Sequence, residues 1–251
     1  MAQIGFNKFQ ILPPVVKNLL IINGIFYLAT FALGKRFGFD LTHILGLHYI
    51  ESEAFYPFQY ITYMFMHSPQ SIWHLVFNMF ALWMFGYTLE NLWGWKRFLI
   101  FYFVTGIGAG LIQTLVQYVE INQLRADLTL EKLNNVVLYG RELFLQGKNY
   151  VDPTMGRYNL ILNIPTVGAS GAVYGILLAF GMLFPNTVLY LYFAIPIKAK
   201  WFVLILIGFE LFTAISNNPG DNVAHFAHLG GMLFAFVLIK YWNKKLRNNF
   251  F

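Results

Sequence analysis

Six long apolar stretches limit what this chain of 251 residues can fold into. A helix needs about 20 mostly apolar residues to cross a bilayer, with a range of about 17 to 25. Stretches of roughly this length lie at 16–33, 72–92, 98–118, 169–191, 200–215 and 223–242. Only 11% of the residues are charged, whereas an average soluble domain has about a quarter. The sequence therefore predicts an all-α membrane protein, a bundle of six membrane-spanning helices in one domain over residues 1–251.

Basic residues predict which way the six stretches cross the membrane. Six crossings place both termini on one side, and that side carries most of the Lys and Arg residues, with Glu90 as its one acid at the edge of a stretch. They are Lys8, Lys17, Lys96, Arg97, Lys198, Lys200, Lys240, Lys244, Lys245 and Arg247. Because cytoplasmic loops are enriched in Lys and Arg, we expect both termini in the cytoplasm.

Composition narrows the partners and the compartment. The chain has no cysteine, which excludes disulfides and thiolate metal sites. Its net charge of +6 fits attraction to anionic lipid better than nucleic-acid binding. No small-residue cleavage site follows the first apolar stretch, so we expect a retained helix and not a signal peptide. These features predict an integral multi-pass protein in the lipid bilayer of a bacterial inner (plasma) membrane, with an organelle membrane as the alternative.

Two outer segments are longer than simple connections. The first, 34–71, is too aromatic for a solvated linker and is expected to fold back into the membrane interface. The second, 120–168, has apolar residues at helical spacing, which predict a helix lying on the membrane surface. These residues are Leu124, Leu128, Val136 and Val137.

Polar side chains interrupt the apolar stretches at four places. Such side chains are costly in hydrocarbon and usually face a cavity or a partner. They are His74 with Asn78, Ser170, Glu210, and His225 with His228. Because the second, fourth and sixth stretches all begin on the outer side, His74, Ser170 and His228 are expected at comparable depth in the outer half of the membrane.

Ser170 and His228 are the residue types that acyl transfer requires. A serine hydroxyl becomes an effective nucleophile when a base takes its proton, and histidine is the usual base. Ser170 also begins a helix whose first backbone N–H groups have no partner within it. Together with Asn78 and His74, those N–H groups could stabilise an oxyanion. No aspartate lies within a predicted span to orient His228, so the pattern predicts a Ser–His dyad.

Small residues around Ser170 have two interpretations. Taken alone, a serine in a stretch rich in Gly and Ala is typical of helix packing. The spacings Gly171-x3-Gly175 and Gly231-x3-Ala235 predict close contact between the fourth and sixth helices. That contact would bring His228 to Ser170, and Tyr174, one turn further on, could stack on the imidazole.

A metal site is the main alternative interpretation of the histidines. However, no carboxylate accompanies His74, His225 and His228 at a metal-ligand spacing, and H-E-x-x-H is absent. We therefore predict no metal and no cofactor. His225 is interpreted as structural or pocket-lining, and Glu210 as a buried acid bonded to a partner.

These motifs resemble the rhomboid family of intramembrane serine proteases. The matching residues are His67 seven residues before His74-x3-Asn78, Gly168-Ala-Ser170-Gly171, Ala227-His228-x2-Gly231, and the glycine–glutamate–glycine turn Gly86, Glu90 and Gly94. The resemblance implies a Ser170 nucleophile, a His228 base, and an oxyanion site of Asn78, His74 and the Ser170 backbone N–H. His67 is interpreted as shaping the loop before the second helix.

The resemblance also implies a class of substrate. Substrates would be membrane-spanning proteins cut near the outer face, where a helix is easily unwound. One departure concerns the first loop, where Phe58 and Gln59 stand in place of the family's Trp-Arg pair. The alternative is a catalytically silent relative that binds or escorts membrane proteins. Silent relatives typically lose the serine or the histidine, and this chain has both.

Overall fold

The computed structural model describes residues 9–69, 71–191, 194–216 and 224–248. Lys8 and the predicted start of the sixth stretch at 223 lie outside them. The described elements are α1 (Pro14–Phe37), α2 (Leu41–Leu45), α3 (Gln59–Thr62), η1 (Tyr63–Phe65), α4 (Ile72–Trp93), α5 (Trp95–Ala126), α6 (Leu130–Leu145), α7 (Pro153–Asn163), α8 (Ser170–Leu183), β1 (Val188–Leu191), β2 (Ile195–Lys198), α9 (Ala199–Ser216) and α10 (His225–Asn248). The fold is mostly helical, as predicted.

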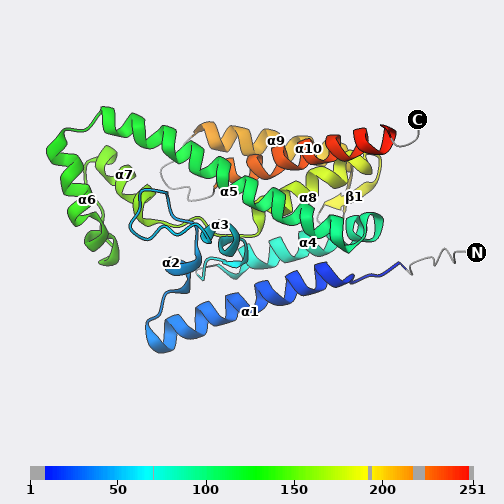
Figure 1. The fold of residues 1–251 in the computed structure, drawn as a ribbon, viewed down its shortest axis with the longest axis horizontal. Coiled ribbons are helices and arrows are strands. Elements are labelled where there is room, and N and C mark those ends of the chain that lie inside the picture. Colours follow the sequence, from blue (N-terminus) through cyan, green and yellow to red (C-terminus); the bar gives the residue numbers. More distant parts are fainter. Residues whose placement is uncertain (1–8, 70, 192–193, 217–223, 249–251) are drawn as a thin grey trace, which may run out of the picture.

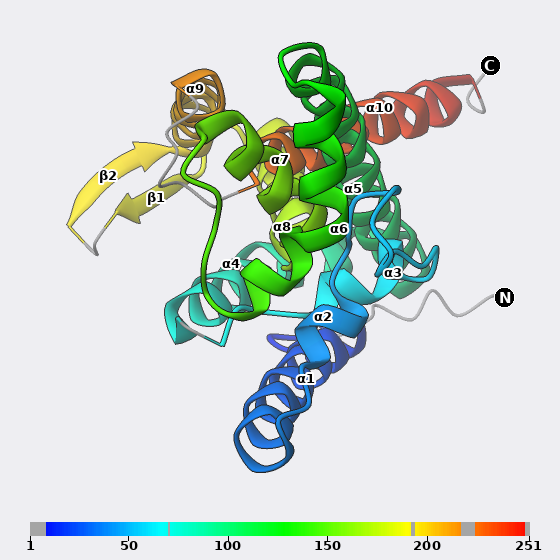
Figure 2. The same cartoon turned by 90° about the vertical axis from the view of Figure 1, so that its left-hand side faces the viewer.

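The described helices form a bundle with α8 near its centre (Figures 1 and 2). Helix α8 contacts α4, α5, α9 and α10. Within the described residues, four helices, α1, α4, α5 and α9, are long and apolar enough to cross a membrane. Their outward faces carry large exposed apolar side chains such as Leu28, Phe77 and Phe212, as expected where lipid replaces water. The first turn of α1 and the last turns of α10 lie at the same end of the bundle (Figure 1).

The fourth apolar stretch is not helical to residue 191, and that prediction is wrong. Helix α8 ends at Leu183, and Pro185 follows, which has no N–H for a helical hydrogen bond. The chain then forms a two-stranded antiparallel hairpin, β1 with β2, in which Leu189 pairs with Ile197. The β-branched and aromatic residues that raise the hydropathy here also favour strands. The fold is therefore not purely α-helical.

Helix α5 is longer than the predicted stretch 98–118. Its 32 residues span about 48 Å at 1.5 Å per residue, which exceeds the roughly 30 Å of a hydrocarbon core. The last turns of α5 reach the insert 120–168, where α6 and α7 build a second small core. That core comprises Tyr49, Ile121, Leu128, Val136, Met155, Tyr158 and Ile161. The four residues behind the predicted surface helix do not share one helix, because Leu124 lies in α5, Leu128 in the turn that follows, and Val136 and Val137 in α6. The place of α6 on the membrane surface stays a prediction.

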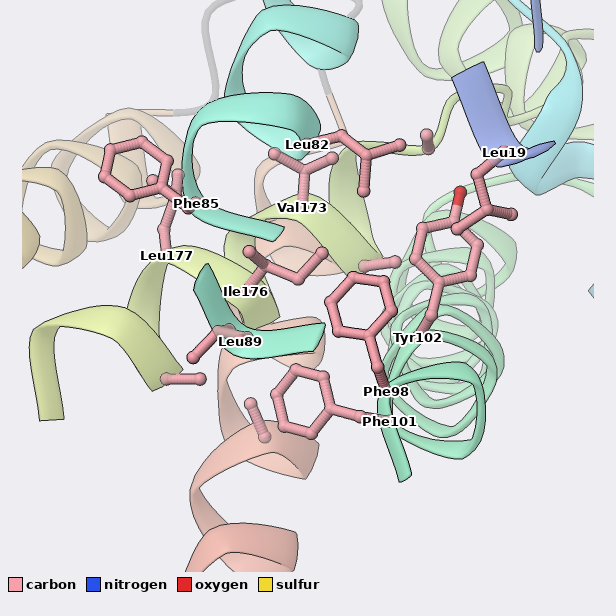
Figure 3. Packing of buried hydrophobic residues seen from close by; sticks show 14 of the residues in the cluster. Leu19, Leu82, Phe85, Leu89, Phe98, Phe101, Tyr102, Val173, Ile176 and Leu177 are labelled. Atoms are coloured by element: carbon pink, nitrogen blue, oxygen red, sulfur yellow. The ribbon is translucent and has the colours of Figure 1, made fainter. Parts of the chain in front are cut away.

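The labelled residues of the main core in Figure 3 come from α1, α4, α5 and α8. They are Leu19 of α1, Leu82, Phe85 and Leu89 of α4, Phe98, Phe101 and Tyr102 of α5, and Val173, Ile176 and Leu177 of α8. Lipid tails are as apolar as these side chains, so close van der Waals packing is what stabilises such contacts within a membrane.

Glu90 explains the glycine–glutamate–glycine motif. Its buried carboxylate accepts hydrogen bonds from the backbone N–H groups of Val15 (2.9 Å) and Val16 (2.8 Å), at the start of α1. Those N–H groups have no partner within their own helix, and a negative charge there is favoured by the helix dipole. Gly86 admits Val16 closely, and Gly94 turns the chain into α5 with φ +76°.

Gln59 stands where the resemblance led us to expect a Trp-Arg pair, and it connects the parts of the first loop. The side chain is fully buried, and its amide donates to the carbonyl oxygens of Ile44 (3.0 Å) and Ala54 (2.8 Å). Its Oε1 accepts from the backbone N–H groups of His48 and Tyr56, each at 3.2 Å. One glutamine therefore connects several turns of the loop.

Candidate active site

A constrained turn places Ser170 as the first residue of α8. Gly168 has φ +130°, a backbone conformation that residues with a side chain rarely adopt. Its N–H donates to the carbonyl oxygen of Tyr63 (3.0 Å), and the Tyr63 hydroxyl donates to the carbonyl oxygen of Gly106 in α5 (2.6 Å). The turn is thus connected to η1 and, through the Tyr63 side chain, to α5. The serine is partly exposed at the start of the helix.

Backbone contact between α8 and α10 brings the predicted pair together. A β-carbon at position 231 would lie 1.9 Å from the carbonyl oxygen of Gly171, and one at position 175 would lie 3.1 Å from the carbonyl oxygen of Gly231. A larger residue at position 231 would therefore push the helices apart. His228 lies one turn before Gly231, on the helix held closest to Ser170.

Ser170 and His228 are within hydrogen-bond distance. His228 Nε2 lies 2.9 Å from Ser170 Oγ, inside the range of about 2.6 to 3.2 Å expected for a nucleophile and its base. The Tyr174 ring stacks on the imidazole, with centroids 4.1 Å apart and planes 5° apart. His228 itself is buried, with 7% exposed, so the ring has little freedom to turn away.

Glu210 lies on the other side of His228, and sequence reasoning did not assign it to the site. Its Oε1 accepts a hydrogen bond from the Tyr174 hydroxyl at 2.5 Å, and its Oε2 accepts one from His225 Nδ1 at 2.6 Å. The same Oε2 is 3.0 Å from His228 Nδ1. That last contact is short but not aligned as a hydrogen bond. The sequence prediction of a dyad took only aspartates as candidates to orient His228, and so it missed Glu210. A lone carboxylate in an apolar stretch nevertheless indicates a buried partner.

The two candidate oxyanion donors, His74 and Asn78, lie one turn apart on α4. A β-carbon at position 168 would lie 3.1 Å from His74 Cε1 and 3.3 Å from Ser170 Oγ, so His74 borders the space next to the serine. Asn78 is buried, and its amide donates to the carbonyl oxygen of His74 at 2.8 Å. Their part in stabilising an oxyanion stays a prediction.

His67 supports His74 from the loop before α4. The two rings meet edge to face, 5.2 Å between centroids, and His67 is fully buried. Burial, and next the neighbouring His74, lowers the pKa of His67 to about 4. A neutral ring at this place fits the loop-shaping part that the sequence suggested.

Three side chains of the site are also close enough to hold a metal ion. Glu210, His225 and His228 each offer a ligand atom, and these atoms lie within 4.8 Å of one another. Two imidazoles and a carboxylate are a ligand set that zinc accepts. The absence of a metal from the working protein stays a prediction.

The fold and this geometry define the class of protein. It is a multi-helix membrane protein in which a serine and a histidine are paired inside the bundle. The chain matches the model of the Rhomboid domain over residues 54–244. It therefore belongs to the rhomboid family, as the sequence motifs indicated.

Two relatives extend this finding. The chain is 27% identical over 166 residues to "Rhomboid protein 1, mitochondrial" of Saccharomyces cerevisiae, a match that covers 66% of this chain and 37% of the relative. It is 30% identical over 166 residues to "RHOMBOID-like protein 12, mitochondrial" of Arabidopsis thaliana, covering 66% and 41%. The chain thus spans about two fifths of the length of these relatives. Because both are mitochondrial by name, the prediction of a bacterial plasma membrane is wrong.

Proposed function

We propose that the protein is an intramembrane serine endopeptidase that uses Ser170 as nucleophile and His228 as base. The observation that carries this proposal is the 2.9 Å contact between His228 Nε2 and Ser170 Oγ, inside a bundle whose outer faces are apolar. A serine is a weak nucleophile without a base at this distance. The mitochondrial names of the relatives extend the proposal to a mitochondrial membrane, which fractionation of cells that express the chain would test.

The geometry supports an acyl-enzyme mechanism. Ser170 Oγ attacks the carbonyl carbon of the scissile peptide bond, and the hydroxyl proton passes to His228 Nε2. When the C–N bond breaks, His228 gives that proton to the leaving amine, and the serine carries the acyl group as an ester. Water then attacks the ester carbon and gives a proton to Nε2. When the C–O bond to Ser170 breaks, His228 passes that proton to Oγ, which releases the acid and restores both side chains.

The negative oxygen formed in each step needs donors that are already in place. The backbone N–H of Ser170 lies at the start of α8, where N–H groups have no partner within the helix. His74 borders the same space, and Asn78 lies one turn further along α4. Donors that are fixed in a site of low dielectric constant stabilise such an oxyanion most strongly.

Hydrolysis within a membrane also requires water. A cleft of about 500 Å³ lies among α5, α7, the end of α9 and the start of α10, and its lining includes Gln113, Thr213 and His225. His225 connects this cleft to Glu210 and so to the site. The polar part of the cleft is a route by which water could reach the ester.

The position of the site supports the proposed substrate class. Ser170 is the first residue of α8, and His228 lies in the first turn of α10. The first turns of these two helices lie on the side of the bundle away from the first turn of α1 (Figure 1). With six crossings, the site would lie near the membrane face opposite both termini. A membrane-spanning protein would reach it near that face.

Labelling with a fluorophosphonate tests the proposal. The wild type is expected to label and to cleave a membrane-spanning test substrate, whereas Ser170→Ala loses the label and both Ser170→Ala and His228→Ala lose cleavage by roughly 10⁴-fold or more. Ser216→Ala is the matched control, because the Ser216 hydroxyl donates to the Phe212 carbonyl oxygen of its own helix and should change neither result.

Two outcomes would contradict this. Label that persists in Ser170→Ala would indicate another nucleophile. A folded wild type that neither labels nor cleaves, but binds a membrane-spanning protein, would favour the silent client-binding alternative.

A further inference from the structure

We propose that Glu210 is a positioning residue for His228, so that the site works as Ser170, His228 and Glu210 together and not as a dyad. This inference rests on the proposed function. None of the sequence motifs includes this acid, because it lies on α9, a helix that carries no motif residue. What assigns it is the place of its carboxylate beside the imidazole nitrogen that does not face the serine.

The burial of Glu210 shows that its carboxylate is held by the site. Only 2% of the residue is exposed, and a buried carboxylate is costly unless hydrogen bonds compensate it. The side chains around it are Tyr174, His225 and His228. Each is either the proposed base or a residue that touches the base, since Tyr174 stacks on the His228 ring.

The tautomer of His228 is the first property that this carboxylate would control. To accept the Ser170 proton, Nε2 must carry no hydrogen, and the hydrogen of the neutral ring must then be on Nδ1. An acceptor next to Nδ1 favours that arrangement. Glu210 Oε2 is 3.0 Å from Nδ1 and is the carboxylate oxygen placed to act as this acceptor.

Charge is the second property. When Ser170 attacks, His228 becomes an imidazolium in a buried place, where an isolated charge would be unfavourable. A carboxylate at 3.0 Å stabilises that cation more strongly than it would in water. The contact is not aligned in the resting protein, and such catalytic contacts often tighten only when substrate is bound.

Tyr174 and His225 keep the carboxylate in place. The Tyr174 hydroxyl holds Oε1 at 2.5 Å while its ring lies flat on His228, so one side chain fixes both the acid and the base. His225 Nδ1 bonds Oε2 at 2.6 Å. This gives His225 a part in positioning the acid, beyond the structural or pocket-lining part expected from the sequence.

The competing explanation is that Glu210 only joins α8, α9 and α10. Under that explanation its loss would lower stability and leave the folded protein's kcat unchanged. Under the proposal, kcat falls while KM stays nearly constant, because the acid touches the base and not the substrate. The two explanations therefore differ in a measurable way.

Glu210→Gln in the full chain is the decisive variant. Glutamine keeps the shape and can still accept from Tyr174, but an amide group that donates towards His228 Nδ1 favours the wrong tautomer. We expect kcat for cleavage of a membrane-spanning test substrate to fall by about 10²- to 10⁴-fold, the upper figure being that of the equivalent change in a Ser–His–Asp triad. KM should change less than about threefold, and the rate of fluorophosphonate labelling should fall with kcat.

Two further variants control for the fold. Ser216→Ala changes the last turn of the same helix, and its hydroxyl donates to the Phe212 carbonyl oxygen at 2.7 Å without touching the Glu210 carboxylate, so kcat should stay within about threefold of wild type. Glu210→Asp restores the charge at a shorter reach, and its kcat should exceed that of Glu210→Gln.

The outcomes separate this inference from the proposed function. A Glu210→Gln protein with wild-type kcat, or one that loses only thermal stability, overturns the inference while leaving Ser170 and His228 untouched. If the wild type itself neither labels nor cleaves, the proposed function fails and the inference fails with it.

Discussion

Glu90 and Glu210 are two buried glutamates at opposite ends of the bundle, and their partners differ in kind. Their exposed fractions are nearly equal, 3% and 2%. Glu90 accepts from two backbone N–H groups at the start of α1. Glu210 is surrounded by a tyrosine hydroxyl and two imidazoles, near the start of α10.

The difference between their partners indicates what each acid does. Backbone N–H groups keep their protons, so Glu90 can join α1 to α4 but has no part in proton transfer. Imidazoles change protonation near neutral pH, so a carboxylate beside them can influence a reaction. The comparison suggests a rule, that a buried polar side chain with backbone partners holds the fold and one with titratable side-chain partners serves the chemistry. The following predictions test that rule.

Among the tests of this rule, Asn78→Ala has the largest expected effect, and it is the case most able to break the rule. The Asn78 amide is bonded to the backbone carbonyl of His74 in its own helix, which by the rule indicates a structural residue. As an oxyanion donor, however, its loss should lower kcat by about 10²- to 10³-fold, equivalent to roughly 2.7–4 kcal/mol. Cleavage kinetics at fixed enzyme concentration would measure this.

Asn122→Ala is the control for Asn78→Ala. Asn122 makes the same bond, from its amide to the Tyr118 carbonyl four residues earlier at 2.9 Å, but lies on an exposed part of α5. Its substitution should leave kcat unchanged. Full activity in Asn78→Ala would remove that residue from the oxyanion site and support the rule.

Glu90→Gln should lower the free energy of unfolding by about 1.5–3 kcal/mol, since glutamine can accept only one of the two backbone hydrogen bonds and each bond to a charged group contributes about that much. Thermal unfolding in detergent would measure the loss. The kcat of the folded fraction should equal that of the wild type. A lower kcat with unchanged stability would reverse the assignment of the two glutamates.

The contrast between these residues also explains what the sequence could predict. Ser170 and His228 could be paired in advance, because each begins a helix on the same side and glycines next to both predict close contact. Glu210 could be placed in a span but not next to His228, because the sequence does not show which face of α9 packs against α10. Hydropathy also could not separate α8 from β1, because it measures apolar content and not the turn that Pro185 introduces.

The prediction with the smallest expected effect concerns the side chains around Glu210 and is tested by removing metal ions. Glu210, His225 and His228 could hold an ion, but a cation on His228 would be the largest local charge and would make the ring a poorer proton acceptor. A chelator such as EDTA should therefore leave kcat unchanged, whereas added zinc should inhibit. Activity lost on chelation and recovered with zinc would show that Glu210 serves a metal, and the comparison with Glu90 would then separate a fold-holding acid from a ligand.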